Sequence, residues 1–214
     1  MSSCLVNASP IADRIGLWVM ETACRQGRLW QQQGHALRLG INLSPSQLQS
    51  GDLAASTAAV LAATGFSPAL LELEVTEDVL LADDARALDL FGRIRGLGVR
   101  IAFDDFGTGY ASLTYLKKFR LDKLKIDRTF VRGLLDDPDD AAIVGFTVNL
   151  GKLLGLAITA EGIEDAATAA MLARMGCEEG QGYHFSPPLP AAEFAQKFLS
   201  AAGAGKAASA PAAA

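Results

Sequence analysis

The chain has 214 residues, of which 50% are hydrophobic and 20% charged, a composition typical of a globular protein with one sizeable core or two small ones. Its formal net charge of -5 leaves no basic surface for bulk nucleic-acid binding. The three cysteines are scattered and odd in number, and no apolar run approaches the ~20 residues of a membrane span, so we expect a cytoplasmic protein without disulfides or a membrane segment.

Short runs rich in valine, isoleucine and leucine alternate with longer segments of helical period. This alternation is typical of strand and helix units repeated around a parallel sheet, which predicts an α/β fold. The strands are expected at 37–42, 70–76, 99–105, 121–127, 156–162 and 180–186. The helices are expected at 11–33, 52–64, 84–96, 110–118, 139–153, 165–174 and 190–201.

The first helical segment carries an apolar stripe at helical spacing. Ile11, Ile15, Trp18, Val19 and Thr22 share one face of a helix. A stripe of this kind is usually part of the core, so we expect these side chains to be buried.

Six strands are two fewer than the eight that close a parallel (β/α) barrel of about 250 residues. The sheet is therefore either open, or a TIM-type (β/α) barrel with about six of its eight strands present. We expect one domain over 1–200. The last segment, 201–214, carries no large side chain to bury and is expected to be a disordered tail.

Polar residues that a core would not favour recur on the predicted strands. Carboxylates and lysines are almost never buried unless they are paired or bind a metal, so their recurrence at strand ends suggests one shared site. The carboxyl ends of the strands are also where an α/β barrel keeps its active site. These residues are Asn42, Glu74, Asp104, Asp105, Lys125, Glu161 and Gln181.

The residue types at these strand ends suggest a reaction. Amide and carboxylate oxygens without histidine or cysteine partners suit Mg²⁺ or Mn²⁺ better than zinc. Adjacent aspartates such as Asp104 and Asp105 can hold two ions that clamp the attacking and leaving oxygens of a phosphoryl displacement. Lys125 on the next strand could orient the attacking water or stabilise phosphate charge. Any one of these residues alone would more often be an ion-pair partner or a surface group.

Five blocks of the sequence carry a family resemblance. They are INLSPSQL, LELEVTED, DDFGTGYASLTYLKKFRLDKLKIDRTFV, TAEGIE and GCEEGQGYHFSPPLP, and they occur in this order between about residue 4 and residue 199. Together they closely resemble the EAL-domain family, bacterial phosphodiesterases that hydrolyse cyclic di-GMP to linear pGpG in a TIM-type barrel. The resemblance implies an enzyme with a two-metal site that uses Mg²⁺ or Mn²⁺.

The resemblance also implies roles for single residues. It makes Asn42, Glu74 and Asp104 ligands of one metal, with Asp104 and Asp105 serving the second. Lys125 would hold or activate the nucleophilic water, Glu161 would support the cluster of metal and water, and Gln181 would line the substrate site. Glu77 would anchor the DDFGTGY loop and couple the contacts of a homodimer to the metal site.

The chain departs from the family pattern in two places. The Glu-Ala-Leu tripeptide is absent; in the family it lies on one of two early strands and supplies a metal ligand. Six strands plus these two would close the barrel. Pro187 stands where the family usually has a basic residue, which would weaken a contact to the dinucleotide. We therefore expect reduced or lost phosphodiesterase activity for this chain alone.

Three hypotheses follow from these matches and departures. In the first, the chain is a metal-dependent phosphodiesterase domain without its early strands, with an upstream sensory or GGDEF-type domain as a possible partner. In the second, it is a non-catalytic module that binds cyclic di-GMP or another protein. In the third, the start codon was assigned too late or the chain is a fragment that does not fold alone, because an open barrel exposes two unpaired strand edges.

Overall fold

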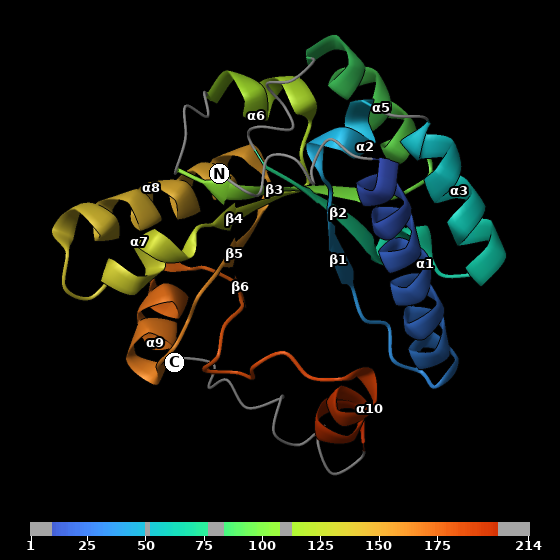
Figure 1. Ribbon diagram of the computed structural model, residues 1–214. Helices are drawn as coiled ribbons and strands as arrows, with labels where there is room; N and C mark the ends of the chain where they lie inside the picture. Colours follow the sequence, from blue (N-terminus) through green and yellow to red (C-terminus); the bar gives the residue numbers. More distant parts are fainter. Residues whose placement is uncertain (1–9, 50–51, 77–83, 108–112, 201–214) are drawn as a thin grey trace.

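The computed structural model describes residues 10–49, 52–76, 84–107 and 113–200. Six parallel strands form one sheet in the order of the sequence, and helices lie along its outer side (Figure 1). This arrangement is an incomplete TIM-like barrel and confirms the predicted fold class. The strands are β1 Leu39–Asn42, β2 Leu71–Val75, β3 Arg100–Phe106, β4 Lys123–Ile126, β5 Ala157–Ala160 and β6 Glu179–Gly180.

The α-helices from α1 to α9 lie along the outside of the half-barrel, and α10 lies at its open side (Figure 1). They are α1 Pro10–Gln32, α2 Pro45–Gln49, α3 Leu53–Thr64, α5 Asp84–Gly96, α6 Leu113–Phe119, α7 Arg128–Gly133, α8 Pro138–Leu154, α9 Ala166–Met175 and α10 Ala191–Phe194. A 3-10 turn, Pro68–Leu70, precedes β2, and a π-helical turn, Ala195–Leu199, follows α10. No helix in these ranges is long and apolar enough to cross a membrane.

The ends of α8 show why this segment is helical between two sharp limits. Asp137 precedes the helix, and its side chain accepts a hydrogen bond from the backbone N–H of Asp139 at 2.8 Å. Pro138 is the first helical residue, where the N–H that proline lacks would have no partner within the helix. Gly155 ends the helix in the left-handed region at φ 69°. The capped helix then returns the chain to the sheet at β5.

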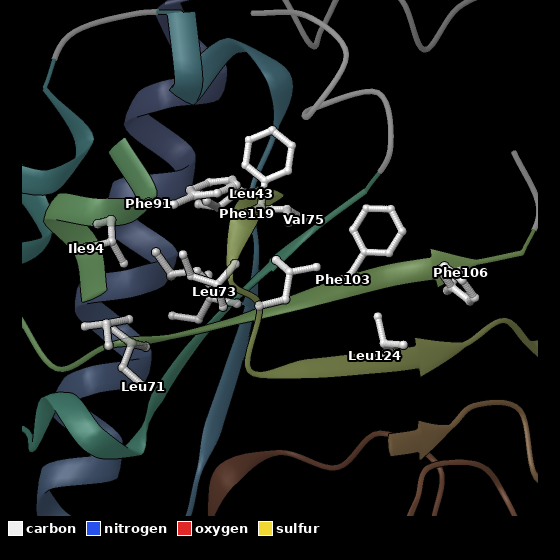
Figure 2. Packing of buried hydrophobic residues seen from close by; sticks show 14 of the residues in the cluster. Leu43, Leu71, Leu73, Val75, Phe91, Ile94, Phe103, Phe106, Phe119 and Leu124 are labelled. Carbon is white, nitrogen blue, oxygen red and sulfur yellow. The ribbon is translucent and has the colours of Figure 1, made fainter. Parts of the chain in front are cut away.

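Alternation along the strands separates an apolar outer face from a charged inner face. On β2, Leu71, Leu73 and Val75 are buried, and Figure 2 shows them packed among the side chains between the sheet and the helices, with Phe91 of α5. The residues between them, Glu72 and Glu74, therefore face the opposite side, which is the barrel interior. The same alternation applies to β4. The core thus fixes the strands from outside and directs their charged residues inward.

The apolar stripe predicted for the first helix is not part of the core, and this prediction was wrong. Ile15, Trp18 and Val19 have exposed fractions of 52%, 65% and 40%, Thr22 is also exposed, and the side chain of Ile11 lies outside the described residues. The buried residues of α1 are instead Met20, Cys24, Gly27 and Trp30. These also recur at helical spacing, and α1 packs with this face toward α2, α3 and β1.

The sixth predicted strand is much shorter than expected. Only Glu179 and Gly180 pair with β5, whereas 180–186 was predicted. After Gln181 the chain turns, because the backbone N–H groups of Phe185 and Ser186 both donate to the carbonyl oxygen of Gly182, at 3.1 and 3.3 Å. The aromatic residues of this segment suggested a strand, but the local turn hydrogen bonds determine its path.

Side-chain contacts between described residues bridge the open side of the half-barrel. The ring of Trp30 near the end of α1 packs against Phe194 of α10 with a centroid distance of 5.3 Å. Arg38, just before β1, forms an ion pair with Glu179 of β6 at 2.9 Å. These contacts join the two ends of the sheet through side chains, although β1 and β6 are not hydrogen-bonded to one another.

Candidate metal centre

The carboxyl ends of four neighbouring strands bring the predicted charged residues together. The ammonium of Lys125 on β4 contacts Glu74 Oε2 of β2 at 2.5 Å and Asp104 Oδ1 of β3 at 3.0 Å. It also contacts Oε1 of Glu161, directly after β5, at 2.6 Å. One buried ammonium therefore lies among three carboxylates, which leaves the cluster with an excess of negative charge.

A bulge in β3 brings the adjacent aspartates to the same place. Successive residues of a regular strand point to opposite faces, but the register of β3 with β4 shifts between Phe103 and Phe106. Asp105 lies within this bulge at φ 54°, in the left-handed region. Carboxylate oxygens of Asp104, Asp105 and Glu161 consequently lie within 4.8 Å of one another. We call these three residues the carboxylate cluster.

The donors of the carboxylate cluster fit a hard divalent cation. All three are carboxylate oxygens, which suit Mg²⁺ or Mn²⁺, and neither histidine nor cysteine takes part in the described group. Asp104 is buried, Glu161 is half-buried and Asp105 is exposed. The cluster is therefore open to solvent on the side of Asp105.

Asp105 holds its proton more tightly than an ordinary aspartate. Burial and the nearby charge of Asp104, together with a hydrogen bond to Asp127, raise its pKa to about 6. Burial also acts on Asp127, but hydrogen bonds from Thr129, one of them from its backbone N–H at 2.8 Å, outweigh it and lower the pKa of Asp127. Asp127 is therefore the charged partner that Asp105 faces.

Asp127 was missed in reading the sequence. It follows β4 directly and caps the start of α7, so its position in LKID, at a strand end like the other candidates, was the available signal. The prediction stopped at Lys125, two residues earlier.

Burial and charge act in opposite directions on Glu74 and Lys125. Burial raises the pKa of Glu74 and outweighs the attraction of the Lys125 ammonium. For Lys125, burial favours the neutral amine, but the charge of Glu74 and the hydrogen bonds that the ammonium donates to Glu161 and Glu74 outweigh it and raise the pKa above its ordinary value. Lys125 is therefore a permanent cation in this site.

The remaining predicted residues lie around this group. Asn42 ends β1, is in register with Glu74 and has an exposed side chain. Gln181 follows β6, is exposed, and donates its backbone N–H to the carbonyl of Ala160 at 2.8 Å. Glu77 lies outside the described residues, and Pro187 is exposed in the segment after β6.

A cavity of about 370 Å³ opens on the inner face of the sheet. It shares Glu74 and Lys125 with the metal centre, and all its charged residues come from the inner sides of the strands or from the segment before β1. It is lined by Arg38, Gly40, Glu72, Glu74, Lys123, Lys125, Thr159, Glu179, Gly180 and Gln181.

Gly40 of β1 provides the space that Glu74 occupies. A Cβ atom at this position would overlap Oε1 of Glu74, whose other oxygen is held by Lys125. We predict that Gly40→Ala lowers the free energy of unfolding by about 1–3 kcal/mol, because the carboxylate must leave its ion pair or the strands must separate. Urea denaturation measures the change. Gly92→Ala is the control, because nothing lies within 4 Å of a Cβ there; equal effects of the two would contradict the prediction.

A family model described as the EAL domain matches residues 5–188 of the chain. Among curated proteins, the chain is 43% identical over 189 residues to the bifunctional diguanylate cyclase/cyclic di-GMP phosphodiesterase MucR of Pseudomonas aeruginosa, covering 85% of this chain and 28% of that protein. The chain spans about a quarter of the length of the curated relatives it matches.

Two solved structures show the same fold. The PaMucR phosphodiesterase in complex with c-di-GMP has a TM-score of 0.82 at 43% identity, with 86% of this chain and 75% of that chain covered. Klebsiella pneumoniae BlrP1 in a complex with manganese and cyclic di-GMP has a TM-score of 0.70 at 29% identity, with 80% of this chain and 43% of that chain covered.

Proposed function

Because the chain belongs to the EAL domain family, we propose that it is a phosphodiesterase that hydrolyses cyclic di-GMP to linear pGpG with Mg²⁺ or Mn²⁺. The observation that carries this proposal is the carboxylate cluster beside the buried ammonium of Lys125. The relatives support it, because MucR is named as a cyclic di-GMP phosphodiesterase and BlrP1 was solved with manganese and the dinucleotide.

The cation would be held by Asp104, Asp105 and Glu161, with Asn42 and Glu74 as the further ligands that the family resemblance implies. A bound divalent cation would lower the pKa of a coordinated water and offset charge on the phosphate. The reaction adds one water across a phosphodiester bond: the water oxygen bonds to phosphorus, and the bond from phosphorus to a ribose 3′-oxygen breaks. One hydrolysis opens the ring and yields pGpG.

Lys125 has to change partners before it can act on water or phosphate. An ammonium has three N–H donors, and Lys125 contacts three carboxylates. When carboxylates of this group turn toward a cation, donors of Lys125 become available. We propose that they then hold the attacking water and stabilise negative charge on the phosphate oxygens.

The affinity for the cation should depend on pH through Asp105. Its pKa is raised to about 6, so below that pH a cation has to displace its proton. We predict that the affinity for Mn²⁺ falls about tenfold for each pH unit below about 6 and levels off above it. Calorimetric titrations at a series of pH values measure this. An affinity that stays constant through this range would show that Asp105 is not a ligand.

We expect the activity of this chain alone to be low. Its sequence contains no Glu-Ala-Leu tripeptide, and the loss of one ligand from a set that acts as a unit can cost nearly as much as the loss of the whole set. The test is incubation with cyclic di-GMP and Mn²⁺, for the chain and for a version extended by the two family strands, with pGpG followed by chromatography. We expect slow product from the chain and faster product from the extended version. Two folded proteins that bind but never cleave would refute the hydrolase proposal.

A second candidate is a module that binds cyclic di-GMP without cleaving it. Calorimetric titration of the dinucleotide in Ca²⁺ and in Mn²⁺, with chromatography of the products, distinguishes the two. A binding module would bind the dinucleotide with either cation and form no pGpG with Mn²⁺. A homodimer and an association with a GGDEF-type or sensory domain remain predictions. Sedimentation of the chain with and without the dinucleotide tests the dimer.

A further inference from the structure

A second layer of charged residues lies below the metal centre on the inner face of the sheet. Glu72 precedes Glu74 on β2 by two positions, Lys123 precedes Lys125 on β4 by two, and Glu179 of β6 precedes Gln181 by two. Residues two apart on a strand share a face. We call Glu72, Lys123 and Glu179 the lower tier, because each lies one step below a candidate site residue on its own strand.

Lys123 connects the lower tier across the sheet. Its ammonium contacts Glu72 Oε1 at 2.8 Å and Glu179 Oε2 at 2.7 Å. Strands β2, β4 and β6 are not neighbours, since β3 and β5 lie between them. Strands separated by one other strand are roughly 10 Å apart. These ion pairs therefore join three strands that have no backbone hydrogen bonds to one another.

The two carboxylates depend on Lys123 to different degrees. Glu72 is 3% exposed; its Oε1 forms the ion pair with Lys123, and its Oε2 has no hydrogen-bond partner among the described residues. Glu179 is less buried and has other partners. It contacts Arg38 at 2.9 Å and accepts a hydrogen bond from the hydroxyl of Thr159 at 3.0 Å.

Strand β6 has little backbone pairing of its own. Its ladder with β5 joins only Thr159 to Glu179 and Ala160 to Gly180. Gln181 extends this pairing, because its N–H donates to the Ala160 carbonyl at 2.8 Å and its carbonyl accepts a hydrogen bond from the Ile163 N–H at 3.0 Å. Among the side chains of β6, that of Glu179 contacts Lys123, Arg38 and Thr159. The lower tier therefore adds side-chain contacts to the backbone hydrogen bonds that position Gln181, two residues after Glu179.

We propose that Lys123 is a positioning residue that ties β2, β4 and β6 together and so sets where Glu74, Lys125 and Gln181 enter the site. The part of this proposal that concerns cation binding rests on the proposed function. The part that concerns the position of Gln181 does not, since it needs only the ion pairs of Lys123 and no bound cation.

The test uses the double variant Glu72→Gln/Lys123→Met in the full chain. It breaks the tie without leaving a buried charge unpaired, because Glu179 keeps Arg38 and Thr159. Lys123→Arg keeps the charge and serves as the conservative variant. Lys152→Met removes an exposed lysine whose ammonium donates to the Met175 carbonyl and is the matched control. If the double variant does not melt cooperatively, Glu179→Gln, which breaks the same tie at the more exposed end, takes its place.

Two measurements are expected to change together. Amide hydrogen exchange of Gln181, followed by NMR, should be about tenfold faster in the double variant, and the dissociation constant for Mn²⁺ should rise about tenfold, as for other residues that orient ligands. In Lys123→Arg the exchange rate at Gln181 and the dissociation constant for Mn²⁺ should stay close to those of the unaltered chain. Lys152→Met should change neither quantity. A double variant that only melts at a lower temperature, with both measurements unchanged, would overturn the proposal.

Failure of the proposed function gives a different result. If the unaltered chain binds no Mn²⁺, the metal proposal fails, and exchange at Gln181 alone decides whether Lys123 positions β6. If the chain binds Mn²⁺ and exchange at Gln181 is the same in all variants, the positioning role fails while the metal site stands.

Discussion

Replacement of Lys125 by methionine is expected to lower the free energy of unfolding of the metal-free chain by about 3–5 kcal/mol. The side chain of Lys125 is 5% exposed and contacts Glu74, Asp104 and Glu161. Without the ammonium, three carboxylates share one poorly solvated site with no opposite charge. Urea denaturation at neutral pH measures the change. Lys152→Met, which removes an exposed lysine, should stay near the unaltered chain because surface changes seldom cost more than about 0.5 kcal/mol.

The same variant separates the structural role of Lys125 from its role in the reaction. Saturating Mn²⁺ should restore much of the lost stability, because a divalent cation offsets the carboxylate charge and binds only the folded state. Formation of pGpG should not return, since the ammonium that holds water and phosphate is gone. Removal of one partner of a buried ion pair normally costs more than about 1 kcal/mol. If the free energy of unfolding of metal-free Lys125→Met falls by less than this, the result would contradict this view of the site.

Replacement of Asp105 by asparagine is expected to lower the rate of pGpG formation by about 10³-fold or more. In a group of residues that acts as a unit, the loss of one member can cost nearly as much as the loss of all of them. The melting temperature, in contrast, should stay the same or rise. The folded-state pKa of Asp105 is raised to about 6 from 3.8, so the folded chain favours the protonated form. Above pH 6 the ionised carboxylate therefore destabilises the fold, and a neutral amide should keep or raise the melting temperature.

The control for this variant is Asp89→Asn. The side chain of Asp89 lies on α5 with 73% exposure, so its replacement should leave both the rate and the melting temperature unchanged. Chromatography of pGpG and thermal melts at pH values above about 6 give the two readouts. An Asp105→Asn protein that keeps its activity would exclude Asp105 from the site, and one that melts much earlier would show that Asp105 is structural.

The composition of the site was largely predictable from the sequence, because it depends on which residues end the strands. In a parallel sheet the strand ends meet at one edge, so the sequence alone predicts that Glu74, Asp104, Lys125 and Glu161 lie together. The two aspartates were also expected together. What allows them to face one another is the bulge at Asp105, and a local change of register is not visible in an apolar pattern.

The parts that could not be predicted depend on what packs against each surface. Two faces of α1 have apolar residues at helical spacing, and only the positions of α2, α3 and β1 decide that Met20 and Cys24 are buried while Trp18 is exposed. Lys123 was likewise passed over, because a lysine within LDKLKID can face solvent or a partner. Its partners Glu72 and Glu179 lie 51 and 56 residues away, and no short-range signal links them.

Calorimetric titration of Mn²⁺ into the unaltered chain, Asp105→Asn and Asp89→Asn tests most directly whether the carboxylate cluster is a metal centre. The heat of binding is expected in the unaltered chain and in Asp89→Asn, and is expected to be lost in Asp105→Asn. Equal heats in all three proteins, or none in a folded unaltered chain, would contradict the assignment of this cluster as the metal site.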